Sequence, residues 1–373
     1  MQTKNHPEIV PTQAFLLRPY QQRAVEWAML SHSGLIIAPA GCGKTLIASS
    51  IIKEAATKFP TVSFGWIAPT RETCQQAIKA LIAAGVDISR VEVRCPHESV
   101  DFSKKAVLIV DEAKHAPAVT WRRIIECCPG SVFGFDATPW GDDPERNAIL
   151  RNLFRNNLYE IKREELGNVL AHATVYMSSA TDFLIQRKID DYIEKLFTER
   201  KRYMRISQPE LRAMCAWEAI TEIGIVGNKQ RNGAAIMFAN CGGHSPTLVL
   251  VPRVTLGEEY AKAIGDAVLV YSKMAKKARR EAMEEFKAGN IKTMIATSLA
   301  DEGLDLPNVE TLVMVSGGRS AQKTIQRASR ALRRADGKDQ AYIHDFKDTF
   351  HPLAQAHANK RIKCYKELGC SIP

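Results

Sequence analysis

The sequence lacks several features that define other classes of protein. No apolar run approaches the roughly 18–20 residues of a membrane-spanning helix, so we expect no membrane partner. The opening residues, MQTKNHPEIVP, lack the apolar segment of a secretory signal. The nine cysteines form no Cys-x-x-Cys pair and no cysteine–histidine cluster at the spacing of a zinc site. Together these absences favour a reduced, cytoplasmic protein without a structural metal.

Length and charge set broader limits on what the protein can be. The chain has 373 residues, which is more than one hydrophobic core usually holds, and this length favours two domains. Lysine and arginine total 51 against 41 acidic residues, which gives a net charge of +10. Such an excess suits a polyanionic partner such as nucleic acid, although many basic proteins bind no polyanion.

Short β-branched segments alternate with helical stretches along both halves, a pattern typical of an α/β fold with parallel sheets. Strands are predicted in the first half at 35–38, 63–68, 91–94, 106–110 and 132–135. In the second half they are predicted at 247–251, 267–270, 292–295, 311–315 and 341–344. We place the boundary within 162–173, which gives domains 1–165 and 166–373, with a helical segment at 182–236 before or within the second domain.

The strongest local motif is APAGCGKT at residues 38–45, between an apolar segment and a helical stretch. A glycine-containing loop in this setting can wrap its N–H groups around a phosphate. Lys44 would reach the β- and γ-phosphates of ATP and Thr45 would ligate Mg²⁺. The common pattern begins with glycine, where this sequence has Ala38, and the alternative is a chance glycine turn. The phosphate-binding residues expected from the motif are Gly41, Cys42, Gly43, Lys44 and Thr45.

A second motif, VLIVDEA at 107–113, places two acids after four apolar residues. Asp111 and Glu112 therefore belong at the carboxyl end of a buried strand, where ligand sites of α/β folds lie. Asp111 can hold Mg²⁺ through water, and Glu112 can orient and deprotonate the water that attacks ATP. A surface acidic turn is the alternative for an isolated pair of acids, and the phosphate loop upstream makes it less favoured.

These two motifs belong to an ordered series that resembles superfamily two helicases and translocases. The other members are LRPYQQ at 17–22, APTRE at 68–72, DATP at 136–139, ATSLADEGLDLP at 296–307 and QRASRALR at 326–333. Serine stands at position 329, where the family usually has glycine. Softer phrases, RNGAAI at 231–236 and LVLVP at 248–252, resemble the branch that contains XPB and the phage UvsW type.

The resemblance implies two RecA-like lobes, an ATP-binding lobe followed by a helicase C-terminal lobe, which close on ATP and move along a strand. Its implied nucleotide contacts are Arg18 and Gln21 to adenine and Asp305 to ribose. Its implied nucleic-acid contacts are Thr70, Arg71 and Thr297. Its implied arginine fingers, which stabilise charge on the γ-phosphoryl group, are Arg330 and Arg333.

Two positions depart from the family pattern. Lys114 stands where His or Asp is usual in the second motif, with His115 after it, and Asp136 opens the third motif, where Ser or Thr is usual. We hypothesise that Lys114 and Asp136 form an ion pair that, with Thr138, couples ATP to strand movement. The alternative is that Lys114 points into solvent and Asp136 caps the following turn.

The partner that the resemblance implies is DNA, because the XPB-like phrases favour duplex DNA. RNA is possible, since the family motifs contact the backbone and tolerate either sugar. Two basic stretches, 200–205 and 273–280, are candidate extra contacts, although solvated helix faces explain them better. A chain with so little outside its motifs is expected to take specificity from its helical segment or from an accessory protein. The alternative function is a nucleotide-gated scaffold with weak hydrolysis, and the sequence does not indicate the oligomeric state.

Overall fold

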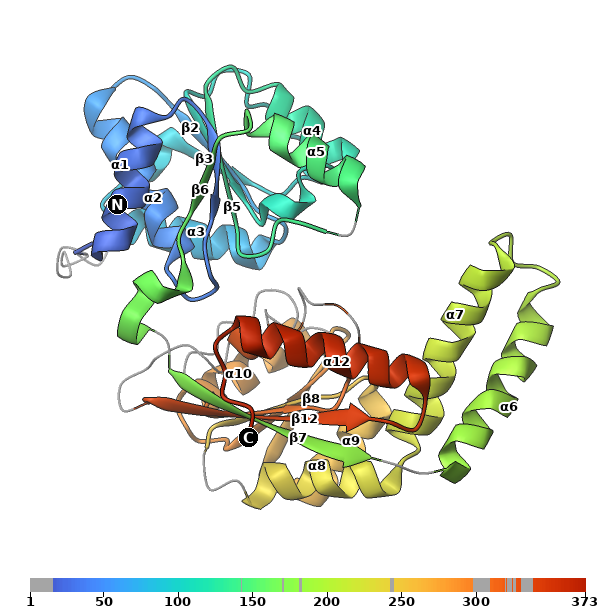
Figure 1. Cartoon of the computed structure of the whole chain (residues 1–373). Coiled ribbons are helices and arrows are strands. Elements are labelled where there is room, and N and C mark those ends of the chain that lie inside the picture. Colours follow the sequence, from blue (N-terminus) through green and yellow to red (C-terminus); the bar gives the residue numbers. More distant parts are fainter. Residues whose placement is uncertain are drawn as a thin grey trace, which may run out of the picture. The chain divides into compact units, whose positions relative to one another are not determined.

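The computed structural model describes residues 16–141, 143–169, 171–180, 183–241, 245–297, 309–318, 320, 324, 327–329 and 338–373. The chain divides into two compact units, Met1–Gly167 and Asn168–Pro373. Each unit is built on one six-stranded sheet (Figure 1). The division falls within the segment 162–173. Within the described ranges, no helix is both long and apolar enough to cross a membrane.

The sheet of the first unit has the strand order β3-β2-β4-β5-β1-β6, and its strands pair in parallel. Its strands are β1 Gly34–Ile37, β2 Phe64–Ile67, β3 Val91–Arg94, β4 Val107–Asp111, β5 Ser131–Asp136 and β6 Leu158–Glu160. Its α-helices are α1 Pro19–Leu30, α2 Lys44–Lys58, α3 Arg71–Ala83, α4 Val119–Glu126 and α5 Pro144–Leu153. Short 3₁₀ turns add η1 Ile88–Arg90 and η2 Ala113–His115, and η3 Arg163–Val169 crosses the division between the two units.

Helices cover both faces of this sheet, with α1, α2 and α3 on one side and α4 and α5 on the other (Figure 1). The central strands are accordingly apolar throughout: every residue of β2 and the first four residues of β4 are buried. Close packing explains why glycine stands at position 34, the start of β1. A Cβ there would lie 2.4 Å from the Trp27 ring and 2.9 Å from the Asn157 carbonyl oxygen, so only glycine lets α1 and the segment before β6 pack this closely.

The sheet of the second unit has the order β7-β12-β11-β8-β10-β9 and is also parallel. Its strands are β7 His172–Ala180, β8 Thr247–Leu250, β9 Ala267–Val270, β10 Thr293–Ala296, β11 Thr311–Met314 and β12 Gln340–Asp348. Its helices are α6 Phe183–Arg200, α7 Gln208–Ala219, the π-helix η4 Ile220–Val226, α8 Lys229–Cys241, α9 Val254–Ile264, α10 Lys276–Lys287 and α12 Pro352–Glu367.

The helical segment expected at 182–236 begins as a hairpin of α6 and α7 that extends from the sheet of the second unit (Figure 1). Ser207 starts α7 with a capping box, in which Ser207 and Glu210 each accept the other's backbone N–H. Arg200, the first residue of the basic stretch 200–205, makes two 2.8 Å hydrogen bonds to Glu218. This part of the stretch therefore fastens the hairpin.

Candidate ATP-binding site and nucleic-acid contacts

The phosphate-loop motif connects β1 to α2, as its sequence predicts. Gly41 and Gly43 adopt φ values of 86° and 84°, in the left-handed region that favours glycine. A Cβ on Gly43 would lie 2.5 Å from Gln21 Nε2, so a larger residue would displace the Gln21 amide as well as strain the backbone. Helix α2 begins at Lys44, and the N–H groups of a helix's first turn have no acceptor within the helix. The loop therefore has the backbone geometry of an anion-binding site.

Two side chains of α1 donate hydrogen bonds to the backbone of this loop. The Tyr20 hydroxyl and Gln21 Nε2 both donate to the Cys42 carbonyl oxygen, at 3.0 and 2.8 Å, and both residues are buried. Gln21 Oε1 also accepts the Arg18 backbone N–H at 2.9 Å. The amide of Gln21 retains one N–H and one lone pair, the combination that an adenine edge can pair with. The adenine contacts of Arg18 and Gln21 stay predictions.

The acidic residues lie at the same edge of the sheet as the loop. Strand β5 lies between β4 and β1, and the pairing sets Asp136 beside Ile37 and Asp111 beside Phe135. Glu112 follows Asp111 with a φ of 52°, a left-handed conformation that costs a non-glycine residue about 1–3 kcal/mol. The edge that carries the phosphate loop thus also carries Asp111, Glu112 and Asp136.

The charges at this edge act on one another. Burial, and then the charge of Glu112, raise the pKa of Asp111 to about 7, against the opposing effect of Lys44. Burial and then Glu112 likewise raise the pKa of Asp136. Burial also acts to raise the pKa of Glu112, but Lys114 and Lys44 outweigh it and hold that pKa below its usual range.

The crowded carboxylates and a nearby hydroxyl suit a hard divalent cation. Asp111 supplies carboxylate oxygens whose raised pKa a cation would lower again, and Thr45, the second residue of α2, supplies a hydroxyl. Lys44 Nζ donates to the Ala38 carbonyl oxygen at 3.2 Å within the phosphate loop. The residues present therefore fit Mg²⁺ and a triphosphate, with Thr45 and Asp111 as the candidate metal ligands.

The hypothesised ion pair between Lys114 and Asp136 is wrong. The Lys114 ammonium pairs with the carboxylate of Glu112, and it is the Lys114 backbone N–H that donates to Asp136 Oδ2, at 2.8 Å. Asp136 Oδ1 accepts the Thr138 N–H at 2.8 Å, so Asp136 does cap the following turn. The other half of the alternative is wrong as well, because the Lys114 side chain is only 14% exposed. Two backbone N–H groups already satisfy Asp136. Glu112 is the residue directly before the short turn η2 that contains Lys114, so its carboxylate is close to the Lys114 ammonium.

The three residues expected to contact nucleic acid, Thr70, Arg71 and Thr297, differ in their surroundings. Thr70 is the N-cap of α3, and its hydroxyl accepts the Thr73 N–H at 3.2 Å. Arg71 is 71% exposed, with its Nε 3.4 Å from Glu98 Oε1. Thr297 directly follows β10, with its N–H 3.4 Å from the Val270 carbonyl oxygen.

Three expected nucleotide contacts, Asp305, Arg330 and Arg333, lie outside the described residues. Separately, the second unit contains a cavity of 720 Å³ that no sequence motif indicated. Its lining includes the ring of Trp217 and Arg327, whose Nη1 donates to Ser316 Oγ at 2.8 Å. An aromatic ring and a guanidinium that line one cavity can accept a nucleobase and a phosphate, respectively. No contiguous motif connects these residues, which is why sequence patterns do not reveal the cavity.

Comparisons with known proteins agree with this architecture. The family described as type III restriction enzyme, res subunit, matches residues 14–90, and the helicase conserved C-terminal domain matches residues 217–335. The chain belongs to the superfamily two helicases. The crystal structure of the Pyrococcus furiosus Hef helicase domain resembles this helicase with a TM-score of 0.54 at 15% identity, over 91% of this chain and 97% of that one. That likeness confirms the fold of two RecA-like lobes.

Two relatives extend the comparison. A putative helicase 22 of a Sulfolobus islandicus filamentous virus is 28% identical over 246 residues, 64% of this chain and 42% of the relative. The DNA 3'-5' translocase XPB2 of Sulfurisphaera tokodaii is 23% identical over 351 residues, 86% of this chain and 79% of the relative. The chain thus spans less than half of the viral relative's length and about four-fifths of the archaeal one.

Proposed function

We propose that this helicase hydrolyses ATP to move along DNA. The observation that carries the proposal is the meeting of the phosphate loop with Asp111 and Glu112 at adjoining ends of β1, β5 and β4. This combination supplies the backbone donors, the cation ligands and the general base that phosphoryl transfer to water needs. The domain roles follow, with ATP binding in the first unit and a helicase C-terminal domain in the second.

The residues proposed to bind the nucleotide can replace their present contacts with contacts to ATP. The N–H groups from Gly41 to Thr45 receive the phosphates, and Lys44 turns from the Ala38 carbonyl oxygen to meet them. Thr45 and Asp111 hold Mg²⁺, which when bound neutralises charge on the phosphate oxygens. Gln21 offers its remaining N–H and lone pair to adenine while keeping the loop fixed through Cys42.

Hydrolysis requires Glu112 to change partners. Its carboxylate now binds Lys114, and as general base it must instead orient the attacking water and accept its proton. Lys114 and Asp136 lie on one connected path, because the Lys114 N–H donates to Asp136 and Asp136 accepts the Thr138 N–H. A shift of the Lys114 backbone that accompanies release of Glu112 would reach Thr138 through Asp136. This path is the proposed coupling between the base and the third motif.

The remaining contacts complete the cycle. Thr70, Arg71 and Thr297 hold the backbone of the nucleic acid, which makes binding tolerant of sequence and sensitive to salt. Asp305 contacts the ribose, and Arg330 and Arg333 stabilise charge on the γ-phosphoryl group. Arginines in this role contribute about 10³–10⁵-fold in rate in other NTPases.

DNA is the favoured substrate because the archaeal relative that spans most of this chain is named as a DNA translocase. RNA is the alternative within the same class. A different class, the nucleotide-gated scaffold with weak hydrolysis, draws support from the ion pair that occupies Glu112. An accessory protein that supplies specificity is part of the proposal.

ATPase measurements with single-stranded DNA, duplex, fork, four-way junction and RNA test this assignment. We expect stimulation by one or more DNA forms, and loss of turnover in Lys44→Ala and Glu112→Gln. Stimulation by RNA alone would assign the helicase to RNA. Absence of stimulated turnover in the wild-type chain would favour the scaffold and overturn the proposed function.

A further inference from the structure

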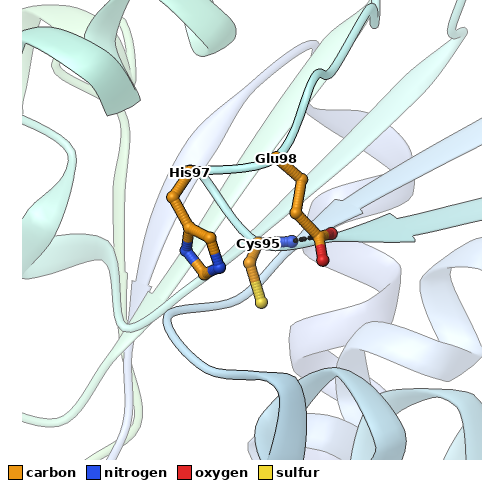
Figure 2. A group of neighbouring side chains, drawn as sticks. All are labelled: Cys95, His97 and Glu98. Carbon is orange, nitrogen blue, oxygen red and sulfur yellow. Dashed lines mark hydrogen bonds between the residues drawn. The ribbon is translucent and has the colours of Figure 1, made fainter.

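A cluster of metal-binding groups lies in the first unit, away from the phosphate loop. Cys95, His97 and Glu98 follow β3, and one ligand atom of each lies within 4.8 Å of the others (Figure 2). A fourth donor comes from α3, because the thiol sulfur of Cys74 lies 3.5 Å from that of Cys95. The sequence hides this group because its two cysteines are 21 residues apart and form no recognised spacing.

From this arrangement we infer that Cys74, Cys95, His97 and Glu98 form a site for a thiophilic divalent cation, with zinc as the expected occupant. Two sulfurs, an imidazole and a carboxylate make up a donor set typical of zinc. Tetrahedral zinc, with bonds of about 2.0–2.3 Å, holds its ligand atoms roughly 3.3–3.8 Å apart. The two sulfurs already have this separation, and the ligand atoms of Cys95, His97 and Glu98, which lie within 4.8 Å of one another, must move closer together on binding.

The combination of two buried thiols with two more accessible donors favours a site over incidental packing. Cys95 is fully buried and Cys74 is 8% exposed, whereas His97 is exposed and Glu98 is half-buried. Buried thiols alone commonly behave as small apolar groups. Here the thiol pair instead adjoins an imidazole and a carboxylate that come from the solvent side, so a cation can reach it. On binding, each thiol releases its proton to solvent and coordinates as the thiolate.

The loop that carries three of the ligands is already held in shape. Glu98 Oε2 accepts the Cys95 backbone N–H at 3.1 Å, which fixes the carboxylate beside its own loop. Glu98 Oε1, the other oxygen, lies 3.4 Å from Arg71 Nε. A bound cation would take this second oxygen and release Arg71. Since Arg71 is a proposed contact to nucleic acid, this consequence, unlike the site itself, rests on the proposed function.

Metal binding to the purified full-length chain, kept reduced, tests the site directly. We expect one equivalent of Zn²⁺ per chain, and a tetrahedral absorption spectrum when Co²⁺ is bound instead. His97→Ala changes an exposed side chain, so the fold should persist while affinity falls about tenfold or more. Cys95→Ser and Cys74→Ser should each weaken the thiolate-to-cobalt absorption, because each removes one of the two sulfur ligands. Cys127→Ser, an exposed cysteine after α4, is the matched control and should bind as wild type.

Three results would overturn the inference. One is the absence of stoichiometric Zn²⁺ from the reduced wild-type chain. Another is unchanged affinity in both His97→Ala and Cys95→Ser. The third is a Cys74–Cys95 disulfide in the isolated protein together with no metal uptake after reduction, which would make the pair a redox element. Metal content is measured without ATP or DNA, so failure of the proposed function leaves this test intact.

Discussion

The ion pair between Lys114 and Glu112 places a positive charge next to the carboxylate that is proposed as the general base. Burial acts to raise the pKa of Glu112, but the charge of Lys114 helps to hold that pKa below its usual range. The Lys114 ammonium also occupies the carboxylate that would bind the attacking water. Lys114→Ala should therefore raise ATP turnover without DNA severalfold and reduce the ratio of stimulated to basal turnover. Steady-state ATPase rates with and without DNA measure both quantities.

The matched control is Lys105→Ala, which removes a lysine 3.1 Å from Glu92 in the same unit and should leave both rates unchanged. A fall in basal turnover to the level of Glu112→Gln would show that Lys114 supports the base. The sequence identified Lys114 and Asp136 as unusual but paired them wrongly. The error arose because the backbone N–H of Lys114, invisible in a residue pattern, is what satisfies Asp136.

A comparison of Gly43→Ala with Gly85→Ala distinguishes the effect of the Gln21 contact on ATP binding from the effect of backbone strain. Gly43→Ala introduces left-handed strain and a Cβ 2.5 Å from Gln21 Nε2, so the bond from Gln21 to the Cys42 carbonyl must shift. ATP affinity should fall about tenfold, roughly the 1.4 kcal/mol of one good hydrogen bond. Gly85→Ala has a comparable φ of 76° but nothing within 4 Å of its Cβ. Equal losses of ATP affinity in the two variants would contradict the proposed role of Gln21.

At the scale of elements, β12 and α12 are joined by buried charge. Asp345 accepts from Arg361 Nε and from the Tyr365 hydroxyl, each at 2.8 Å, and all three residues are buried. Arg361 Nη1 also donates to the Gly318 carbonyl oxygen at 3.0 Å. Asp345→Ala would leave the guanidinium buried without its partner and should lower the free energy of unfolding by about 3–5 kcal/mol.

Urea denaturation followed by circular dichroism measures this loss. The control is Lys363→Ala on the exposed side of α12, whose pair with Glu367 spans 3.9 Å and should contribute less than about 1 kcal/mol. A loss in Asp345→Ala no larger than the control would show that water or a rearranged side chain satisfies Arg361.

The pairing of β12 with β7 also carries a titratable group. His344 stacks against Tyr176 on β7 and Phe238 on α8, with ring centroids 5.3 and 4.5 Å away, and burial lowers its pKa. Between its lowered pKa and the ordinary value of 6.5, the folded state binds fewer protons than the unfolded state. Stability is therefore greatest above that ordinary value and falls as the pH falls through the window.

His344→Phe should flatten this dependence, because phenylalanine keeps the stacking and removes the proton. The melting temperature between pH 7.5 and 5 in wild type and variant measures it, on the order of a few degrees. The exposed His172 provides the control His172→Gln, which should leave the slope unchanged. An unchanged slope in His344→Phe would place the acid sensitivity elsewhere.

Element prediction from the sequence succeeded where strands are buried on both faces. The apolar segments at β2, β4, β8 and β11 are continuous and were located to within a residue or two. The short β6 and the mixed polar sequence of β7 were not predicted. The partner of β7 is β12, about 168 residues further along the chain, so only the tertiary pairing identifies β7 as a strand.

At the scale of the whole molecule, the motifs reveal the phosphate loop and the acid pair because each is contiguous in sequence. The proposed cation site and the cavity lined by Trp217 are assembled from distant segments, and neither is visible before folding. The function proposed for the molecule depends on residues of both units acting on one ATP cycle.

Displacement of a triplex-forming strand from duplex DNA tests that central claim most directly, because the third strand leaves only when a protein moves along the duplex. We expect ATP-dependent displacement by the wild-type chain, none with Lys44→Ala or Glu112→Gln, and none in the double variant Arg330→Ala with Arg333→Ala. We also expect displacement to weaken as salt rises. Displacement that persists in Glu112→Gln, or DNA-stimulated hydrolysis without any displacement, would contradict it.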